Sequence, residues 1–169
     1  MLVDSSVLIP LSRVGRLDLL ERLFRRVETT REVYRECVEE GAGRPGSEAL
    51  RSAFADWLVI VEAPRGARRF AEAEGIEMAD ASLILSCERE RAALLSNDDH
   101  LVRVARSRGV PVRWLTSIVI AAVTRGFLSK REAKDLLTDL VHSGMWLSPG
   151  VFAAVFAALD EMPEKSRRN

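Results

Sequence analysis

Short apolar runs alternate along the chain with longer segments in which apolar residues recur every three or four positions. The short runs predict strands at residues 1–3, 27–29, 58–61, 93–96 and 110–114. The run at 58–61 is continuous and β-branched, which is typical of a strand buried on both faces. The longer segments predict helices, and strands that alternate with helices favour a parallel, doubly wound sheet. We therefore expect an α/β fold with three layers.

Residues that favour helix ends mark the borders of several predicted helices. The hydroxyl groups of Ser5 and Ser6 are expected to cap a helix that begins at Val7. Thr30 is a good cap for a helix over residues 31–40, and Ser47 for one that extends to about Trp57. Further helices are expected over 78–91 and 98–108 and in a segment that ends at Gly75.

Beyond residue 116 the pattern becomes entirely helical. Helices are predicted over residues 117–125, 130–141 and 149–159, with Ser129 as the cap of the second. We interpret residues 1–162 as a single domain whose helical extension begins at about residue 117, and 163–169 as a flexible tail. The last two helices carry apolar stripes, formed by Leu136, Leu137, Leu140 and Val141 and by Phe152, Val155, Phe156 and Leu159. These stripes either complete the core of the chain or stay partly exposed and form an interface.

Composition narrows the class of protein. Of 169 residues, 47% are hydrophobic, which is enough for a sizeable core in one domain. Lys and Arg together number 25 and so do Asp and Glu, so no global positive field indicates nucleic-acid binding. A local basic patch is still compatible with this balance, and the candidates for phosphate contact are Arg13, Arg103 and Arg106.

The location of the protein is also constrained. Cys37 and Cys87 lie far apart in apolar contexts, as expected for small buried side chains in a reducing compartment. No signal peptide is expected from the first residues, and no apolar stretch is long enough to span a membrane. We therefore expect a cytoplasmic protein with no membrane partner.

Acidic residues stand at the ends of predicted strands. Asp4 follows the first strand, and Asp98 follows the strand that ends at Ser96. Asp80 begins a helix, and Glu36 interrupts an apolar stripe. Ligands of open parallel sheets bind beyond the carboxyl ends of the strands, so these acids are expected to share one crevice. Their mutual repulsion would be relieved by Mg²⁺ or Mn²⁺, since hard cations favour oxygen ligands.

Each acid also has an ordinary structural interpretation. Asp80 and Asp98 are plausible helix caps, and Asp4 is able to bond the backbone of its own turn. Glu36 has Arg31 and Arg35 as possible ion-pair partners, and the neighbouring acids Asp99 and Glu77 are expected to be solvated or to support the others. Glycine-rich phosphate loops and a GxSxG motif are missing from the sequence, and neither His100 nor His142 has ligand spacing to a partner.

In this order and spacing, the acidic motifs resemble those of PIN domains, specifically nucleases related to the VapC toxins. The resemblance covers nearly the whole chain, and the helical tail is similar to one sub-branch of such proteins. It rests on the segments Leu2-Val3-Asp4-Ser5-Ser6, Glu32-Val33-Tyr34-Arg35-Glu36, Ala79-Asp80-Ala81-Ser82 and Leu94-Leu95-Ser96-Asn97-Asp98-Asp99.

The resemblance implies a metal-dependent ribonuclease, commonly a toxin held inactive by a small antitoxin and paired as a homodimer. It implies that Asp4, Asp80 and Asp98 hold Mg²⁺ or Mn²⁺ and that Glu36 completes the catalytic cluster. Ser6 would fix the rotamer of Asp4, with Asp99 in a supporting position or as the fourth acid in place of Asp98.

Three alternatives stay open at this point. The chain could be an inactive PIN-fold module that binds RNA or a protein. It could also be a phosphotransfer receiver, although receivers place their acidic pair after an early strand. An aspartyl phosphatase would usually have a second acid two residues after the first, where this sequence has Ser6.

Overall fold

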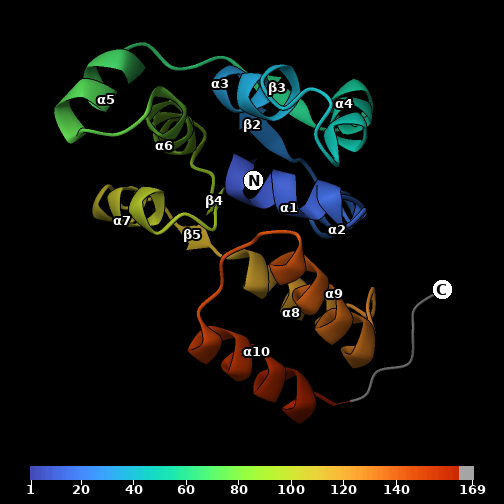
Figure 1. Cartoon of the computed structure of the whole chain (residues 1–169). Coiled ribbons are helices and arrows are strands. Elements are labelled where there is room, and N and C mark those ends of the chain that lie inside the picture. The colour runs from blue at the N-terminus through green and yellow to red at the C-terminus, as the bar shows by residue number, and fades with distance from the viewer. Residues whose placement is uncertain (164–169) are drawn as a thin grey trace.

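The sheet consists of five parallel strands, as expected for an α/β fold. The computed structural model describes residues 1–163 and places the strands in the order β3-β2-β1-β4-β5 (Figure 1). The strands are β1 (Leu2–Val3), β2 (Glu28–Thr30), β3 (Val59–Val61), β4 (Leu94–Leu95) and β5 (Val112–Arg113). Apart from residue 163, the tail expected to be flexible lies outside the described residues.

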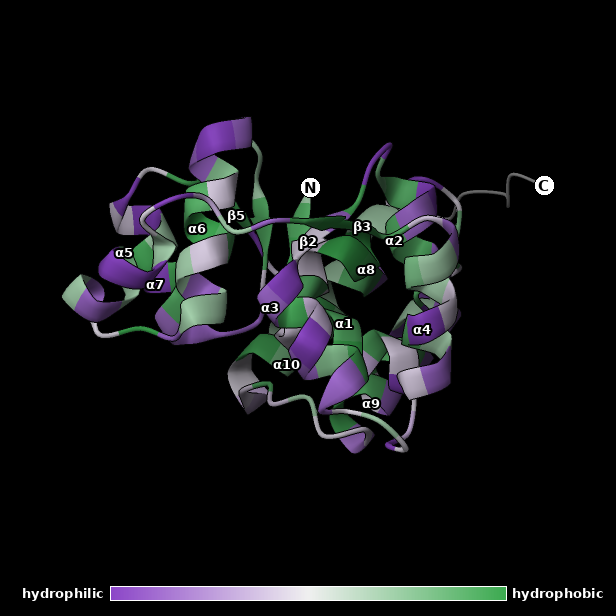
Figure 2. Cartoon of the chain, turned by 90° about the horizontal axis from the view of Figure 1, so that it is seen from above, coloured by the Kyte–Doolittle hydropathy of each residue, from purple (hydrophilic) through white to green (hydrophobic). Residues whose placement is uncertain are grey.

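Helices cover both faces of the sheet. Helices α5, α6 and α7 gather on one side of the strands, and α1, α2, α4 and α8 on the other (Figure 2). The first elements are α1 (Ser5–Arg13), α2 (Asp18–Leu23), α3 (Arg31–Tyr34), the π-helical segment η1 (Arg35–Glu39) and α4 (Ser47–Asp56). They are followed by α5 (Ala67–Glu74), α6 (Met78–Glu90), α7 (Asp99–Ser107) and the C-terminal helices α8 (Leu115–Thr124), α9 (Lys130–His142) and α10 (Pro149–Glu161).

The strand predicted to be the most buried lies at the edge of the sheet. Val59 of β3 is 38% exposed, whereas Leu2 and Val3 of the central strand β1 are fully buried. The prediction of burial on both faces was wrong for β3, because a β-branched run records strand propensity and does not record the position of the strand in the sheet.

Two of the expected helix caps were wrong. A third residue stands at the predicted cap position but makes no capping hydrogen bond. The carboxylate of Asp4 caps α1, which begins at Ser5 and not at Val7. Ser47 is the first residue of α4, and the residue before it is Gly46, with a φ of 88°. Thr30 stands at the cap position of α3, but its hydroxyl accepts a hydrogen bond from Ser82 (2.8 Å) and does not cap the helix.

The cap expected at Ser129 is confirmed. Its side chain accepts a hydrogen bond from the backbone N–H of Glu132, whose own side chain accepts from the backbone of Ser129. This reciprocal pair is a capping box, which the spacing of the two residues allows.

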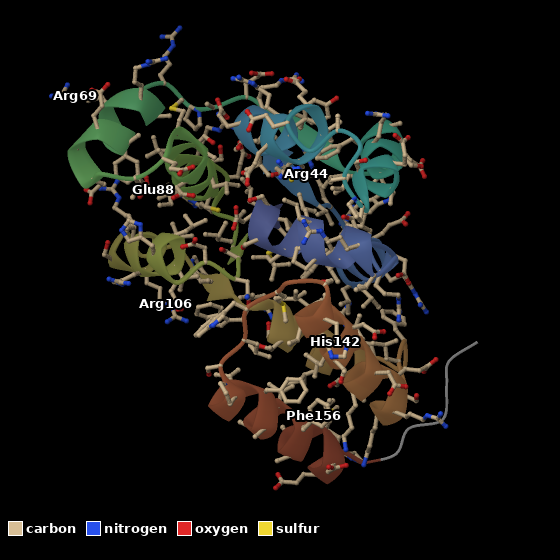
Figure 3. The ribbon with its side chains drawn as sticks, in the orientation of Figure 1. Arg44, Arg69, Glu88, Arg106, His142 and Phe156 are labelled. Atoms are coloured by element: carbon tan, nitrogen blue, oxygen red, sulfur yellow. The ribbon has the colours of Figure 1, made fainter. Side chains whose placement is uncertain are left out.

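The C-terminal helices complete the core of the chain. Helix α8 packs against α2 and α9, and α10 packs against both α8 and α9. Val155 and Leu159 of α10 are buried, while Phe152 and Phe156 stack with their ring centroids 4.4 Å apart. Phe156 lies on the side of α10 that faces α9 (Figure 3), where the amino group of Lys134 stands over its ring. The apolar stripe is therefore largely used within the chain, and a homodimer would need another surface.

None of the helices within residues 1–163 combines the length and the apolar character needed to cross a membrane. Both cysteines are buried and free, as the sequence predicted.

The packing of α10 predicts that it unfolds together with the rest of the domain. Leu159 is fully buried, so replacing it with alanine removes core contacts and should lower the free energy of unfolding by about 2–5 kcal/mol. Chemical denaturation followed by circular dichroism measures this loss. The control is Val151→Ala in the same helix, where the side chain is 44% exposed and the change should stay below about 1 kcal/mol. Equal, small losses in both variants would show that α10 is not part of the core.

Candidate metal centre

The acidic residues meet at the carboxyl edge of the sheet. Asp4 directly follows β1, and Asp98 follows β4, the strand beside it. Asp80 lies in the first turn of α6, which packs against β1, β2 and β4 and leads back to the amino end of β4. The first turn of α6 therefore lies at the same edge as Asp4 and Asp98, which is the position where ligands bind in doubly wound sheets.

Asp4 is buried and held by its neighbours. Its side chain is only 5% exposed, and its Oδ1 accepts a hydrogen bond from the backbone N–H of Ser5 (2.7 Å). Its Oδ2 accepts from the backbone N–H of Ser6 (3.3 Å), from the hydroxyl of Ser6 and from the hydroxyl of Ser96 (3.0 Å). Burial raises the pKa of Asp4, and these hydrogen bonds oppose the rise because they stabilise the charged form.

Two serines connect Asp4 to the loop that carries Asp98. The hydroxyl of Ser6 accepts a hydrogen bond from the backbone N–H of Asn97 (2.9 Å), and the hydroxyl of Ser96 accepts from that of Asp98 (3.0 Å). The expected contact between Ser6 and Asp4 is present, but sequence reasoning gave Ser96 no role in the site. The signal for Ser96 was its spacing of two residues from Asp98, which mirrors the spacing between Asp4 and Ser6.

Asp98 is exposed and caps a helix. Its Oδ1 accepts a hydrogen bond from the backbone N–H of Leu101 (2.8 Å), so the ordinary interpretation as a cap of α7 is correct. Its charge nevertheless raises the pKa of Asp80, and Asp99 is not among the charges that do so. Asp99 instead lines a neighbouring pocket. Of the two adjacent acids, Asp98 is therefore the one that belongs to the cluster.

Asp80 carries the clearest sign of a functional site. It is partly buried and does not cap α6, since Glu77 occupies the cap position. Burial, as the largest cause, and the negative charges of Asp4, Asp98, Glu77 and Glu36 together raise the pKa of Asp80 to about 7. Every neighbouring charge that shifts this pKa is negative. Within residues 1–163, the cluster therefore concentrates carboxylates, and no arginine or lysine is among the charges that shift the pKa of Asp80.

Glu36 reaches the cluster from a distorted helix. It lies in η1, where the helix widens to π geometry, a feature that is frequent at functional sites. Val33 and Cys37 beside it are buried, as expected, but Glu36 itself is exposed. Partial removal from water still raises the pKa of Glu36, and the charge of Asp4 adds to the rise, while a hydrogen bond with the side chain of Ser5 opposes it.

The ion pairs that would have explained Glu36 in ordinary terms are made elsewhere. Arg31 pairs with Glu62 (3.1 Å), and Arg35 pairs with Glu39 (3.7 Å). Neither of these two arginines forms an ion pair with Glu36, so its charge adds to the negative charge of the cluster.

A comparison with family models decides the class of the protein. The model of the family DUF3368, described as a PIN domain, matches residues 1–161. The chain belongs to this PIN-domain family. PIN domains are generally nucleases that act on nucleic acids and typically use divalent metal ions. No curated protein matches the chain.

The carboxylates of this PIN domain fit a hard divalent cation by their chemistry. Mg²⁺ and Mn²⁺ prefer oxygen ligands, and a cation would offset the repulsion that, after burial, raises the pKa of Asp80. Within residues 1–163, however, no three side chains of Asp, Glu, His or Cys stand close enough together to hold an ion as they are now oriented.

The arginines proposed as phosphate ligands have other contacts in this PIN domain. The guanidinium of Arg13 donates a hydrogen bond to the backbone carbonyl of Ser143 (2.8 Å), so Arg13 joins α1 to the end of α9. Arg106 stands over the ring of Trp114, with its Cζ 5.8 Å from the ring centroid. Arg103 is exposed on α7, and His142 is exposed at the end of α9 (Figure 3).

The raised pKa of Asp80 predicts how the metal-free protein responds to pH. Between 3.8, the ordinary pKa, and about 7, the folded chain keeps a proton that the unfolded chain releases. This contribution to stability is present at acid pH and is lost as the pH rises toward 7. With EDTA present, the free energy of unfolding of the wild type should fall between pH 5 and pH 8 more steeply than that of Asp80→Asn, as measured by urea denaturation.

The control for this prediction is Asp56→Asn. Asp56 is exposed and ends α4 directly before β3, at the amino edge of the sheet and away from the cluster. Its variant should keep the pH slope of the wild type. If Asp80→Asn kept that slope as well, the carboxylates would not repel one another in the folded chain.

Proposed function

We propose that this PIN domain is a metal-dependent endoribonuclease that hydrolyses phosphodiester bonds of RNA. The observation that carries the proposal is the cluster of carboxylates around Asp80, whose charges all raise its pKa and which a bound cation would offset. A structural role does not require carboxylates to be gathered in this way, since their repulsion lowers the stability of the folded chain.

Each acid has a role that follows from its surroundings. Asp4, Asp80 and Asp98 would hold Mg²⁺ or Mn²⁺, which would lower the pKa of the attacking water and stabilise charge on the phosphate. Asp4 is the fixed point of this set, because both of its oxygens are already oriented by hydrogen bonds. Glu36, exposed at the rim, would accept the proton of the water as the water oxygen bonds to phosphorus and the bond to the ribose oxygen breaks.

The remaining polar groups act on these acids. Ser6 and Ser96 position Asp4, and their hydroxyls also fix the backbone of Asn97 and Asp98. We propose single-stranded RNA as the substrate, because an open edge engages splayed nucleotides more easily than a duplex.

The decisive variant is Asp4→Asn. The amide keeps the size of the side chain and removes the charge, so cleavage of single-stranded RNA with Mg²⁺ or Mn²⁺ should fall at least about 100-fold while the fold is kept. Gel analysis of end-labelled RNA measures the rate, and circular dichroism checks the fold. Asp56→Asn at the opposite edge of the sheet should cleave like the wild type.

Two results would contradict the proposal. Cleavage that persists in Asp4→Asn, or that proceeds equally with EDTA, would place the activity outside the cluster. A wild-type protein that binds RNA but cuts none of a varied set of RNAs would instead support the alternative function, a PIN-fold binding module.

The resemblance to VapC toxins extends this proposal to a biological role. We propose that the protein is the toxin of a toxin–antitoxin pair, acts in the cytoplasm and forms a homodimer. Induced expression of the wild type in a bacterial host should then arrest growth, whereas Asp4→Asn at the same level should not. Light scattering of the purified protein should give twice the 18.8 kDa mass of one chain. Growth that is unaffected by the wild type would rule out the toxin role, and a mass of one chain would rule out the dimer.

A further inference from the structure

A pocket adjoins the acidic cluster at the carboxyl edge of the sheet. Its volume is about 440 Å³, which is within the range of pockets that bind small molecules. Asn97 and Asp99, which flank Asp98 after β4, form one wall, and Trp114 and Thr116, which follow β5, form another. Trp146 and Val151, from the loop before α10 and from its first turns, close the pocket. The strands β1, β4 and β5 are neighbours in the sheet. Along its carboxyl edge, Asp4 and Asp98 are therefore followed by the pocket.

Trp146 is the unusual feature of this pocket. Its side chain is 73% exposed, although tryptophan is highly buried on average in folded proteins. The loop around it is fixed, because Met145 is buried, Leu147 is half-buried and the backbone carbonyl of Trp146 accepts a hydrogen bond from the side chain of Asn97 (3.3 Å). The same Asn97 donates its backbone N–H to Ser6 (2.9 Å), which holds Asp4. The backbone that carries the exposed ring is therefore held by the same network that positions Asp4.

We propose that this pocket binds a nucleobase of single-stranded RNA beside the bond that is cut, with the base stacked on the ring of Trp146. The inference rests on the proposed function, since it assigns a subsite to the same centre. Aromatic rings bind single-stranded nucleic acids by stacking on bases, and the side chains of Asn97 and Thr116 offer hydrogen-bonding groups for the edge of the base.

Charge and size favour a base over other occupants. Arg106 lies on the side of α7 toward α10 (Figure 3), stands over Trp114 and is exposed, so it brings a positive charge to the pocket for the phosphate that follows the base. An ordinary protein interface buries about 1,600 Å² in total. Of the large apolar side chains that are exposed within residues 1–163, only Trp146 and Val151 line this pocket. Two such side chains are enough to contact one base but form too small an apolar area for a protein interface.

The first test separates binding from cleavage. In the inactive Asp4→Asn protein, fluorescence anisotropy with a labelled single-stranded RNA and Mg²⁺ measures the dissociation constant. Adding Trp146→Ala should weaken binding about tenfold or more, and Trp146→Phe should restore most of the affinity. Val59→Ala is the matched control: Val59 is also exposed, but it begins β3 at the amino edge of the sheet and its loss should have no effect.

The second test removes the partner of Trp146. A series of RNAs, each lacking one base, should contain one position at which Trp146→Ala no longer weakens binding, and that position should adjoin the bond cut by the wild type. If Trp146→Ala weakened every RNA in the series equally, the ring would only shape the loop, and the proposal would be overturned. If Trp146→Ala left the RNA affinity unchanged and lowered the mass measured by light scattering, the proposal would also be overturned. The pocket would then be assigned to contact with a second copy of the chain.

The two proposals fail in different ways. RNA that binds through Trp146 but is never cut by the wild type would leave the base pocket standing and overturn the nuclease. RNA that is cut at the cluster with equal KM in the wild type and in Trp146→Ala would overturn the pocket alone.

Discussion

The site depends on one buried carboxylate at the end of the central strand. Asp4 is held by Ser5, Ser6 and Ser96, and it is the fixed negative charge against which the other acids are placed. Burial of Asp80 is the largest cause of its raised pKa, and the charge of the buried Asp4 raises this pKa in the same direction. The repulsion between these acids lowers the stability of the folded chain when no cation is bound. A cation that binds at this edge of the sheet would restore that stability.

The parallel sheet explains why residues far apart in the sequence share this field. The ends of β1, β4 and β5 lie side by side, so Asp4, Asp98 and Trp114 follow one another along a single edge although more than 100 residues separate the first from the last. Serine hydroxyls connect the loops that follow β1 and β4, and Asn97 extends the same connection to the loop of Trp146. Metal binding and base binding would therefore be coupled through backbone positions and not only through proximity.

Sequence patterns were sufficient for the fold, since strands that alternate with helices allow few topologies. They also predicted that Asp4 and Asp98 lie at one edge of the sheet, because both acids follow parallel strands. They were insufficient where tertiary packing decides the outcome. The π-helical turn that contains Glu36 has no local signature, and the sequence of β3 is typical of a buried strand although β3 lies at the edge. Ser96 was missed although its spacing from Asp98 mirrors the spacing between Asp4 and Ser6, because such a spacing is weak evidence until the hydroxyl is seen between the two acids.

We propose that the carboxylates around Asp80 gather at this edge of the sheet because they bind a cation. Calorimetric titration with Mn²⁺, repeated in buffers of different ionisation enthalpy, measures both the affinity and the number of protons released. The wild type should bind Mn²⁺ at pH 7 with release of protons, because the raised pKa leaves Asp80 partly protonated before the ion enters. Asp80→Asn should bind more weakly and release fewer protons. Binding by Asp80→Asn with the same affinity and the same proton release as the wild type would contradict it.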